Sequence, residues 1–243
     1  GAAMLYFTGS KAHNIAVRRI IVDKGMKLNE YGVWKEDKQV AGKTEEDVYA
    51  EADMAWVPPE MREDRGEVDV AREGELPDLL EEHHLHGDLQ MHTTRTDGKN
   101  SLREMAEAAA EMGHDYIAIT DHSQRVTVAG GLKPKEIEEQ MKEIEKLNDD
   151  LDDLTVLKGI EVDILEDGSL DVPDSLLAEL DIVVCSVHYQ RNLSREMQTK
   201  RILKAMENDN FMILGHPTGR LIGQREGMDL DMERLIEAAK ERD

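Results

Sequence analysis

The 243-residue sequence predicts an α/β protein with a mainly parallel sheet, preceded by a smaller α+β segment. From Gly87 onward, five strand-like runs alternate with segments of helical periodicity, which favours parallel strands joined by crossover helices. Each run also ends close to a histidine or a carboxylate. The sheet is either open or closed into a barrel, and in both cases functional residues gather at the carboxyl ends of the strands.

The leading segment is expected to contain a helix over residues 11–24, with Ser10 as its N-cap and Gly25 at its end. Its apolar residues recur at helical spacing at Ala12, Ile15, Ala16 and Ile20. A β-like stretch over residues 28–34 follows. A second helix starts at Thr44, with Asp47 near capping-box spacing.

From Arg62 to His86 the chain is charged and lacks clear periodicity. We interpret this part as a connector with one short helix near residues 76–80. The chain is therefore expected to have domains at residues 1–62 and 87–243, joined by a connector at residues 63–86.

The second domain is expected to hold strands at residues 88–92, 116–120, 156–164, 182–187 and 211–214. One helix starts at Ser101, with Glu104 three residues later, and ends at Gly113. Another has Pro134 in its first turn and apolar residues at positions 137, 141, 144, 147 and 151. Two more are expected over residues 194–208 and from residue 229 to the end.

The net charge of −23 is unfavourable for DNA binding, because phosphates attract basic surfaces. The charge is uneven, however. Residues 1–43 contain eight Lys and Arg against four acidic residues, so they carry +4 and the remainder carries −27. Two explanations stay open for the acidic remainder: a solvated surface, or adaptation to high salt, which screens long-range repulsion.

The sequence has no run long enough for a membrane span and no signal-like leader. Its single cysteine, Cys185, excludes an internal disulfide and fits a reducing cytoplasm. Cys185 lies in an apolar run, so we interpret it as a core residue rather than a reactive thiol. We expect a cytoplasmic monomer. Neither end resembles a natural terminus, so we also expect a fragment.

Metal-ligand side chains follow every expected strand. In chain order they are His92 with Asp97, His122, Glu161 with Asp163, His188 and His216. If the sheet closes, these groups converge on one mouth. Histidine and carboxylate together suit Zn²⁺, Mn²⁺ or Fe, and such ions in pairs lower the pKa of water and neutralise phosphoryl charge. The pattern predicts a polynuclear metal site for phosphoester hydrolysis. His114 precedes its strand and is interpreted as structural, and His83, His84 and His86 fall in the connector.

These motifs resemble the PHP (polymerase and histidinol phosphatase) superfamily, whose fold is a distorted (βα)7 barrel with a trinuclear metal site. The opening motif of the family, His-x-His with a later Asp-Gly, is matched by Gln90-Met91-His92 and Asp97-Gly98, with Gln in place of the first His. The pair His84 and His86 lacks an Asp-Gly at that spacing. The resemblance implies two or three divalent ions, held by Gln90, His92, Asp97, His122, Glu161, His188 and His216. The last family motif, Asp-x-His, has no counterpart, which implies a barrel incomplete at its C-terminus, with about five of seven strands.

The leading segment resembles the thumb of family X DNA polymerases, which in microbial members precedes a PHP domain. The matching residues are Tyr6-Phe7-Thr8-Gly9-Ser10 with Asn14 and Arg18, then residues 44–49 and 56–60. The resemblance implies nucleotide or DNA contacts for Tyr6, Phe7, Gly9, Ser10, Asn14 and Arg18. It also implies that the polymerase palm, with its carboxylates and Mg²⁺, lies upstream, so this chain is not expected to polymerise DNA.

Together the two resemblances imply a DNA repair enzyme whose PHP domain is a metal-dependent phosphodiesterase, a 3′-5′ exonuclease on single-stranded or gapped DNA. The thumb would contact dNTP in the full-length protein. Asp163 and Arg220 are expected to assist catalysis, Arg220 as a phosphate clamp. Two alternatives stay open: a phosphomonoesterase of histidinol-phosphatase type, and an inactive PHP domain that braces the polymerase, which Gln90 favours. Weak or absent activity is expected of the truncated chain.

Overall fold

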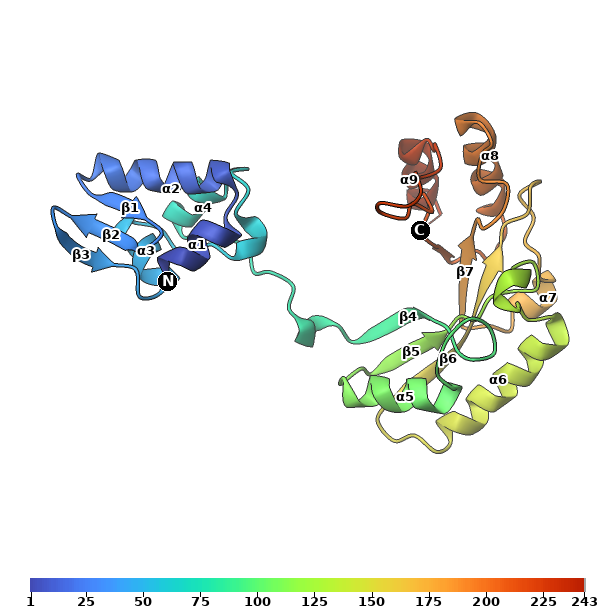
Figure 1. Cartoon of the computed structure of the whole chain (residues 1–243). Coiled ribbons are helices and arrows are strands. Elements are labelled where there is room, and N and C mark those ends of the chain that lie inside the picture. The colour runs from blue at the N-terminus through green and yellow to red at the C-terminus, as the bar shows by residue number, and fades with distance from the viewer. Residues whose placement is uncertain (243) are drawn as a thin grey trace. The chain divides into compact units, whose positions relative to one another are not determined.

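The computed structural model describes residues 1–242, and the chain divides into two compact units, the first at Gly1–Leu80 and the second from Glu81 onward (Figure 1). Each unit has its own hydrophobic core, with Leu5, Val17 and Tyr49 in the first and Ile160, Val183 and Ile202 in the second. Among the described residues, no helix is both long and apolar enough to cross a membrane.

The first unit combines short helices with a small antiparallel sheet. Its elements are α1 (Ala2–Thr8), α2 (Lys11–Asp23), β1 (Lys27–Asn29), β2 (Gly32–Lys35), β3 (Lys38–Ala41), α3 (Glu45–Glu51), η1 (Pro59–Met61) and α4 (Glu67–Glu73). The predicted caps are confirmed: Ser10 accepts a hydrogen bond from the His13 amide, and Thr44 and Asp47 form a capping box. Helix α1 and strand β3 were not predicted.

The buried face of α2 differs from the predicted apolar stripe. His13, Val17 and Ile21 are buried, whereas Ala12 is exposed and Ile15 is 53% exposed. The reason is that His13 is a partner of buried polar groups. Its Nδ1 lies 2.6 Å from Glu67 Oε1, and its Nε2 lies 2.9 Å from the Tyr49 hydroxyl.

The predicted helix near residues 76–80 is wrong, because residues 75–81 have no regular structure. The helix of this region is α4, which lies earlier and contributes Val68 and Ala71 to the first core. Glycines with positive φ, Gly66 at 109° and Gly74 at 73°, flank α4 and fix its ends. Part of the expected connector therefore belongs to the first unit.

Five parallel strands form the sheet of the second unit and pair in chain order. They are β4 (Gly87–Met91), β5 (Tyr116–Ile119), β6 (Thr155–Asp163), β7 (Ile182–Ser186) and β8 (Ile213–Leu214). The connecting helices are α5 (Leu102–Glu111), α6 (Pro134–Asn148), α7 (Asp174–Leu177) and α8 (Arg195–Ala205), and α9 (Met232–Lys240) follows β8. The turns η2 (Glu82–His84) and η3 (Thr127–Ala129) complete the unit.

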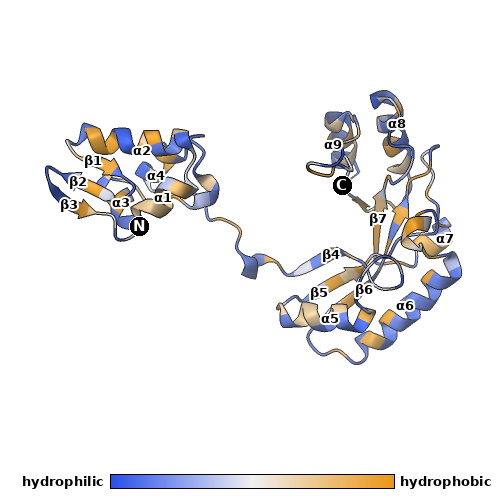
Figure 2. Ribbon diagram, viewed as in Figure 1, coloured by the Kyte–Doolittle hydropathy of each residue, from blue (hydrophilic) through white to orange (hydrophobic). Residues whose placement is uncertain are grey.

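The sheet is curled, and its strand order has no reversal, as in a barrel rather than a doubly wound sheet. This confirms the α/β prediction and agrees with a PHP barrel that is incomplete within this chain. Strands β5, β6 and β7 are largely apolar, whereas α6 exposes a polar face (Figure 2). Cys185 is fully buried in β7, and burial raises the pKa of its thiol, as expected of a core residue.

Candidate metal centre

Glu161 lies at the centre of the candidate site, near the carboxyl end of β6. Its neighbours come from the ends of the other strands: His92 after β4, His122 after β5, His188 after β7 and His216 after β8. Because β4–β8 are parallel, all five strand ends meet at one edge of the sheet. Backbone pairing brings two of these residues together directly, since His122 and Glu161 form a parallel β-bridge.

The two carboxylate oxygens of Glu161 face two different pairs of histidines. Oε2 lies 3.3 Å from both His92 Nε2 and His122 Nδ1. Oε1 lies 3.3 Å from His188 Nε2 and 2.8 Å from His216 Nε2. Each oxygen and its histidine pair form a group in which all ligand atoms lie within 4.8 Å of one another. Glu161 therefore belongs to both groups of candidate ligands.

Asp97 adds a carboxylate to the first of these groups. Its oxygens lie 3.6 Å from His92 Nδ1 and 3.5 Å from His122 Nε2. The loop can return so closely because Gly98 has no side chain: a Cβ there would lie 2.4 Å from the carbonyl oxygen of His92. The Asp-Gly pair is thus tied to His92 by the geometry of the loop.

The electrostatics of the site keep Glu161 charged. Burial raises its pKa, but hydrogen bonds from His188, His216 and His92 outweigh burial and hold that pKa well below its usual range. Burial lowers the pKa of His92, yet Glu161 more than offsets this, so the pKa is raised overall. Burial lowers the pKa of His122 below its ordinary value. A carboxylate among four imidazoles remains an anion that attracts cations.

Two buried nitrogen atoms without partners indicate that the site suits a metal ion. The Nδ1 atoms of His92 and His122 are buried and have no hydrogen-bond partner among the described residues. Buried polar atoms in proteins nearly always have a partner, and a bound metal ion supplies one where the protein does not. With four imidazoles and two carboxylates, the donor set suits Zn²⁺, Mn²⁺ or Fe.

Asp163 lies behind His188 rather than at the centre. Its Oδ1 accepts hydrogen bonds from His188 Nδ1 and from the His188 backbone amide, each at 3.0 Å. Burial lowers the pKa of His188, but the carboxylates of Asp163 and Glu161 outweigh burial and raise that pKa to about 9. With Nδ1 donating to Asp163, Nε2 of His188 is the atom turned toward Glu161.

Asp121 organises the loop after β4, a role that the sequence reasoning did not assign. Its buried carboxylate accepts hydrogen bonds from the Thr93 amide at 2.8 Å, the Thr93 hydroxyl at 2.6 Å and Gln140 Nε2 at 2.6 Å. The Thr96 hydroxyl also donates to it. These bonds fix the segment between His92 and Asp97. A carboxylate directly before a candidate ligand histidine was the only signal in the sequence.

His216 has an unusual backbone. Its φ is +24°, which is rare for a residue other than glycine. The preceding Gly215 packs so closely on β7 that a Cβ there would lie 2.3 Å from Ser186 Oγ. Strained backbone at a residue that also carries a candidate ligand is a feature of functional sites.

The remaining predicted site residues lie outside this cluster. Gln90 is an exposed residue of β4, and in the described part of the chain its side chain makes no hydrogen bond. Arg220 is exposed in the loop after His216, and within residues 1–242 only its backbone amide is hydrogen-bonded, to Thr218 Oγ1. His114 is 3.3 Å from the Leu85 carbonyl, and His86 is paired with Asp115.

The predicted nucleotide-contacting residues gather where α1 meets α2. Phe7 is 78% exposed and packs edge-on against the half-exposed Tyr6. Asn14 donates to the carbonyl oxygens of Tyr6 at 3.1 Å and Gly9 at 3.0 Å, and Ser10 caps α2. Arg18 is exposed farther along α2. Asn14 thus ties the backbone at the end of α1 to the start of α2, beside the exposed aromatic pair.

The fold and the site define a class of protein. It is an α/β protein with a curled parallel sheet and a histidine–carboxylate cluster at the carboxyl edge of that sheet. Residues 88–242 match the family model of the PHP domain, and residues 3–63 match that of the DNA polymerase beta thumb. The chain belongs to the PHP domain family, and the thumb precedes that domain. Both resemblances predicted from the sequence are confirmed.

The chain is similar to the DNA polymerase/3′-5′ exonuclease PolX of Bacillus subtilis, with 43% identity over 240 residues, which cover 97% of this chain and 41% of that protein. It is 31% identical over 146 residues to a probable phosphatase of Thermoanaerobacter sp., covering 58% of this chain and 55% of the relative. A probable phosphatase of Clostridium acetobutylicum is 30% identical over 159 residues, which cover 64% of this chain and 60% of that protein. The chain thus spans less than two thirds of each of these relatives.

Proposed function

We propose that this chain is part of a family X DNA polymerase and that its PHP domain is a metal-dependent phosphodiesterase, acting as a 3′-5′ exonuclease at DNA ends. The observation that carries the proposal is the carboxylate of Glu161, shared between two pairs of histidines. The similarity to PolX over 97% of the chain supports the choice of DNA as substrate. DNA polymerase thumbs contact DNA and nucleotides, which supports the same partners here.

Two or three divalent ions would be held by His92, Asp97, His122, Glu161, His188 and His216. When bound, such ions activate water and neutralise charge on the phosphoryl group. Gln90 is retained only as a weak seventh ligand, because an amide oxygen carries no charge and the residue is exposed.

The protein itself supplies orientation and charge. Glu161 stays ionised, so it holds the two histidine pairs together without first losing a proton. Asp163 is proposed as a positioning residue, since it fixes the ring of His188 through Nδ1. Arg220 is close in sequence to His216 and remains a candidate contact for the DNA backbone.

In the thumb, Tyr6, Phe7, Gly9, Ser10, Asn14 and Arg18 are proposed to contact nucleotide or DNA. The exposure of Phe7 and Arg18 supports this, because a stacking ring and a cation suit a nucleotide. A cytoplasmic location remains part of the proposal, supported by the single buried cysteine and by DNA as the proposed partner. A monomer remains a prediction.

A phosphomonoesterase is the second candidate, because several similar proteins are named probable phosphatases. Against it stands the thumb, which a small-molecule phosphatase does not need. The third candidate, an inactive domain that braces the polymerase, is supported only by Gln90.

The test uses the full-length protein, because weak or absent activity is expected of the truncated chain. It compares Mn²⁺-dependent degradation of a 3′-labelled single strand with hydrolysis of p-nitrophenyl phosphate. We expect shortening of the strand from its 3′ end, lost in His122→Ala and retained in His114→Ala, a histidine outside the cluster. Preferred hydrolysis of the monoester would favour the phosphatase. Inactivity toward both substrates, with metal bound, would favour the brace.

A further inference from the structure

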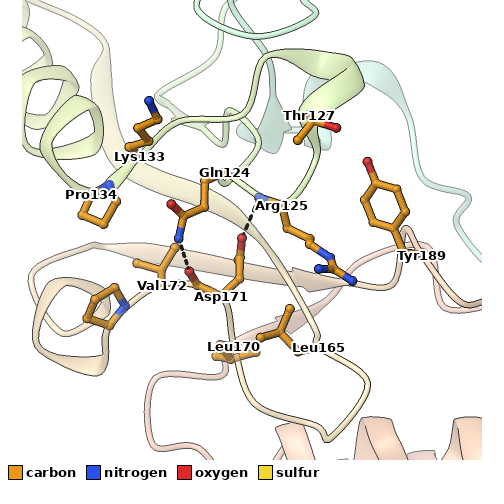
Figure 3. Close-up of a pocket in the computed structure, with 11 residues that line it drawn as sticks. Gln124, Arg125, Thr127, Lys133, Pro134, Leu165, Leu170, Asp171, Val172 and Tyr189 are labelled. Carbon is orange, nitrogen blue, oxygen red and sulfur yellow. Dashed lines mark hydrogen bonds between the residues drawn. The ribbon is translucent and has the colours of Figure 1, made fainter.

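A pocket of about 950 Å³ lies beside the candidate metal centre, in the second unit (Figure 3). Figure 3 shows Lys133 and Gln124 on one side, Thr127 and Tyr189 on another, and Leu165 and Leu170 along a third. Pockets of this size hold ligands as large as a nucleotide. None of these side chains belongs to the candidate metal centre.

Two residues that line the pocket, Tyr189 and Asp171, are linked to the metal centre. Tyr189 directly follows His188 in the chain. Asp171 accepts a hydrogen bond from the Arg125 amide at 2.9 Å through one oxygen and from the Asp163 amide at 3.0 Å through the other. Since Asp163 in turn holds His188, a ligand in the pocket would lie next to the Glu161–His188 group.

The lining of the pocket combines a stacking surface with two basic side chains, Lys133 and Arg125, of which Arg125 is paired with Glu166 at 2.7 Å. The guanidinium carbon of Arg125 lies 5.4 Å from the centre of the Tyr189 ring, and Leu165, Leu170 and Val172 provide an apolar surface. Lys133 is exposed and forms no ion pair within residues 1–242. In a chain of net charge −23, an unpaired cation at the rim of a pocket favours an anionic ligand.

Polar groups also line the pocket. The Tyr189 hydroxyl is buried, and in the described part of the chain it has no hydrogen-bond partner. Thr127 offers an exposed hydroxyl on the same side of the pocket (Figure 3). An apolar surface, a ring with its cation and a few polar groups are the elements with which proteins bind a nucleoside.

We propose that this pocket holds the terminal nucleotide of the strand, with its nucleoside against Tyr189 and Leu170 and its 5′-phosphate turned toward the Glu161 centre. The proposal rests on the proposed phosphodiesterase function and deepens it by assigning the part of the substrate that a small phosphate ester lacks. Lys133 then contacts a phosphate, and the Arg125–Tyr189 pair contacts the base or sugar.

The experiment uses the full-length protein and compares two substrates that differ only in the nucleoside: thymidine 5′-(p-nitrophenyl phosphate) and bis-(p-nitrophenyl) phosphate. The variant Thr127→Trp fills the pocket from an exposed turn. The matched control is Val128→Trp, because Val128 is the next residue of the same turn, is 90% exposed and does not line the pocket. We expect kcat/KM for the thymidine substrate to fall about tenfold in Thr127→Trp, the size of one lost base contact.

In the same variant, hydrolysis of bis-(p-nitrophenyl) phosphate should stay within about twofold of the unchanged chain, and Val128→Trp should alter neither substrate. An equal loss on both substrates in Thr127→Trp, or no loss on either, would overturn the proposal.

Binding of dTMP, measured by calorimetry in EDTA, separates this proposal from the proposed function. We expect saturable binding to the unchanged chain and to Val128→Trp, and its loss in Thr127→Trp. Hydrolysis without dTMP binding would overturn the pocket and leave the phosphodiesterase standing. Binding of dTMP without hydrolysis of either diester would support the pocket and count against the phosphodiesterase.

Discussion

At the scale of single residues, the charge of Glu161 decides what the site can do. The Glu161 carboxylate is buried, yet hydrogen bonds from the histidines keep its pKa well below the usual range. Burying a charge is costly unless it is paired, so in this site the carboxylate and the imidazoles depend on one another. A neutral residue of the same shape would leave the histidines in place without the anion that they surround.

Asp163→Asn tests the positioning of His188. The amide of asparagine can present a donor to Nδ1 and removes the negative charge, so the ring loses its fixed orientation. We expect affinity for Mn²⁺ to fall by about 10–100-fold, the usual effect of removing a partner of a ligand histidine. Titration calorimetry measures it, with the exposed Asp152→Asn as control. Unchanged affinity in Asp163→Asn would show that His188 does not need this contact.

At the scale of elements, Asp121 joins three parts of the second unit. It directly follows the strand-like run of β5, and its carboxylate binds the loop after β4 and Gln140 of α6. In Asp121→Asn, the new amide group would face donors rather than acceptors. We expect a loss of about 2 kcal/mol in the free energy of unfolding, together with weaker Mn²⁺ binding. Urea denaturation measures the free energy of unfolding. A variant with unchanged stability and unchanged metal affinity would contradict the proposed link between this network and the site.

Helix α4 provides a second test at this scale, because Glu67 ties it to His13 in α2. Burial raises the pKa of Glu67, but the bond from His13 and the amides of Arg65 and Asp64 lower it overall. A carboxyl whose pKa is lowered on folding adds stability above its unfolded pKa, and this is lost as pH falls through the folded value.

We therefore expect Glu67→Gln to lower the free energy of unfolding by about 1–3 kcal/mol at pH 7. The difference should shrink as the pH is lowered through about 4.5 and below, the unperturbed range of a Glu side chain. Denaturation curves at several pH values measure this, with Glu73→Gln as control, since Glu73 is an exposed residue of the same helix. A pH-independent difference would contradict the role of ionised Glu67.

The sequence predicted the elements with strong local signals. The caps at Ser10, Thr44 and Ser101 and the apolar runs of β6 and β7 all depend on neighbouring residues. Short elements such as α7, with four residues, carry too little periodicity to be recognised. Helix α4 was missed because its stability depends on contacts with α2, more than 40 residues away.

The candidate site was predictable to a similar extent and for a similar reason. Parallel strands put His92, His122 and Glu161 at one edge once the strands are known, so their convergence follows from the pattern. The bonds of Asp121 to Thr93 and of Asp171 to Arg125 join loops that only the folded chain brings together. The spacing of residues in the sequence does not predict such contacts.

At the scale of the whole molecule, the two units have separate cores and separate proposed tasks. All ligand candidates of the metal centre lie in the second unit. A chain that begins at Glu81 should therefore bind Mn²⁺ with a Kd within about twofold of the whole chain, as expected of an independent domain. Residues 1–80 should show no stoichiometric binding. Loss of binding on removal of the first unit would show that the centre depends on it.

Glu161 is proposed to be shared between two cation sites. The most direct test is elemental analysis of the chain, dialysed against Mn²⁺ or Zn²⁺ and freed of excess, beside Glu161→Gln and the control His114→Ala. We predict about two ions per chain for the unchanged protein and for His114→Ala, as in two-ion hydrolytic sites. Glu161→Gln should hold fewer than one. The same metal content in Glu161→Gln as in the unchanged chain would show that the two cation sites do not depend on Glu161.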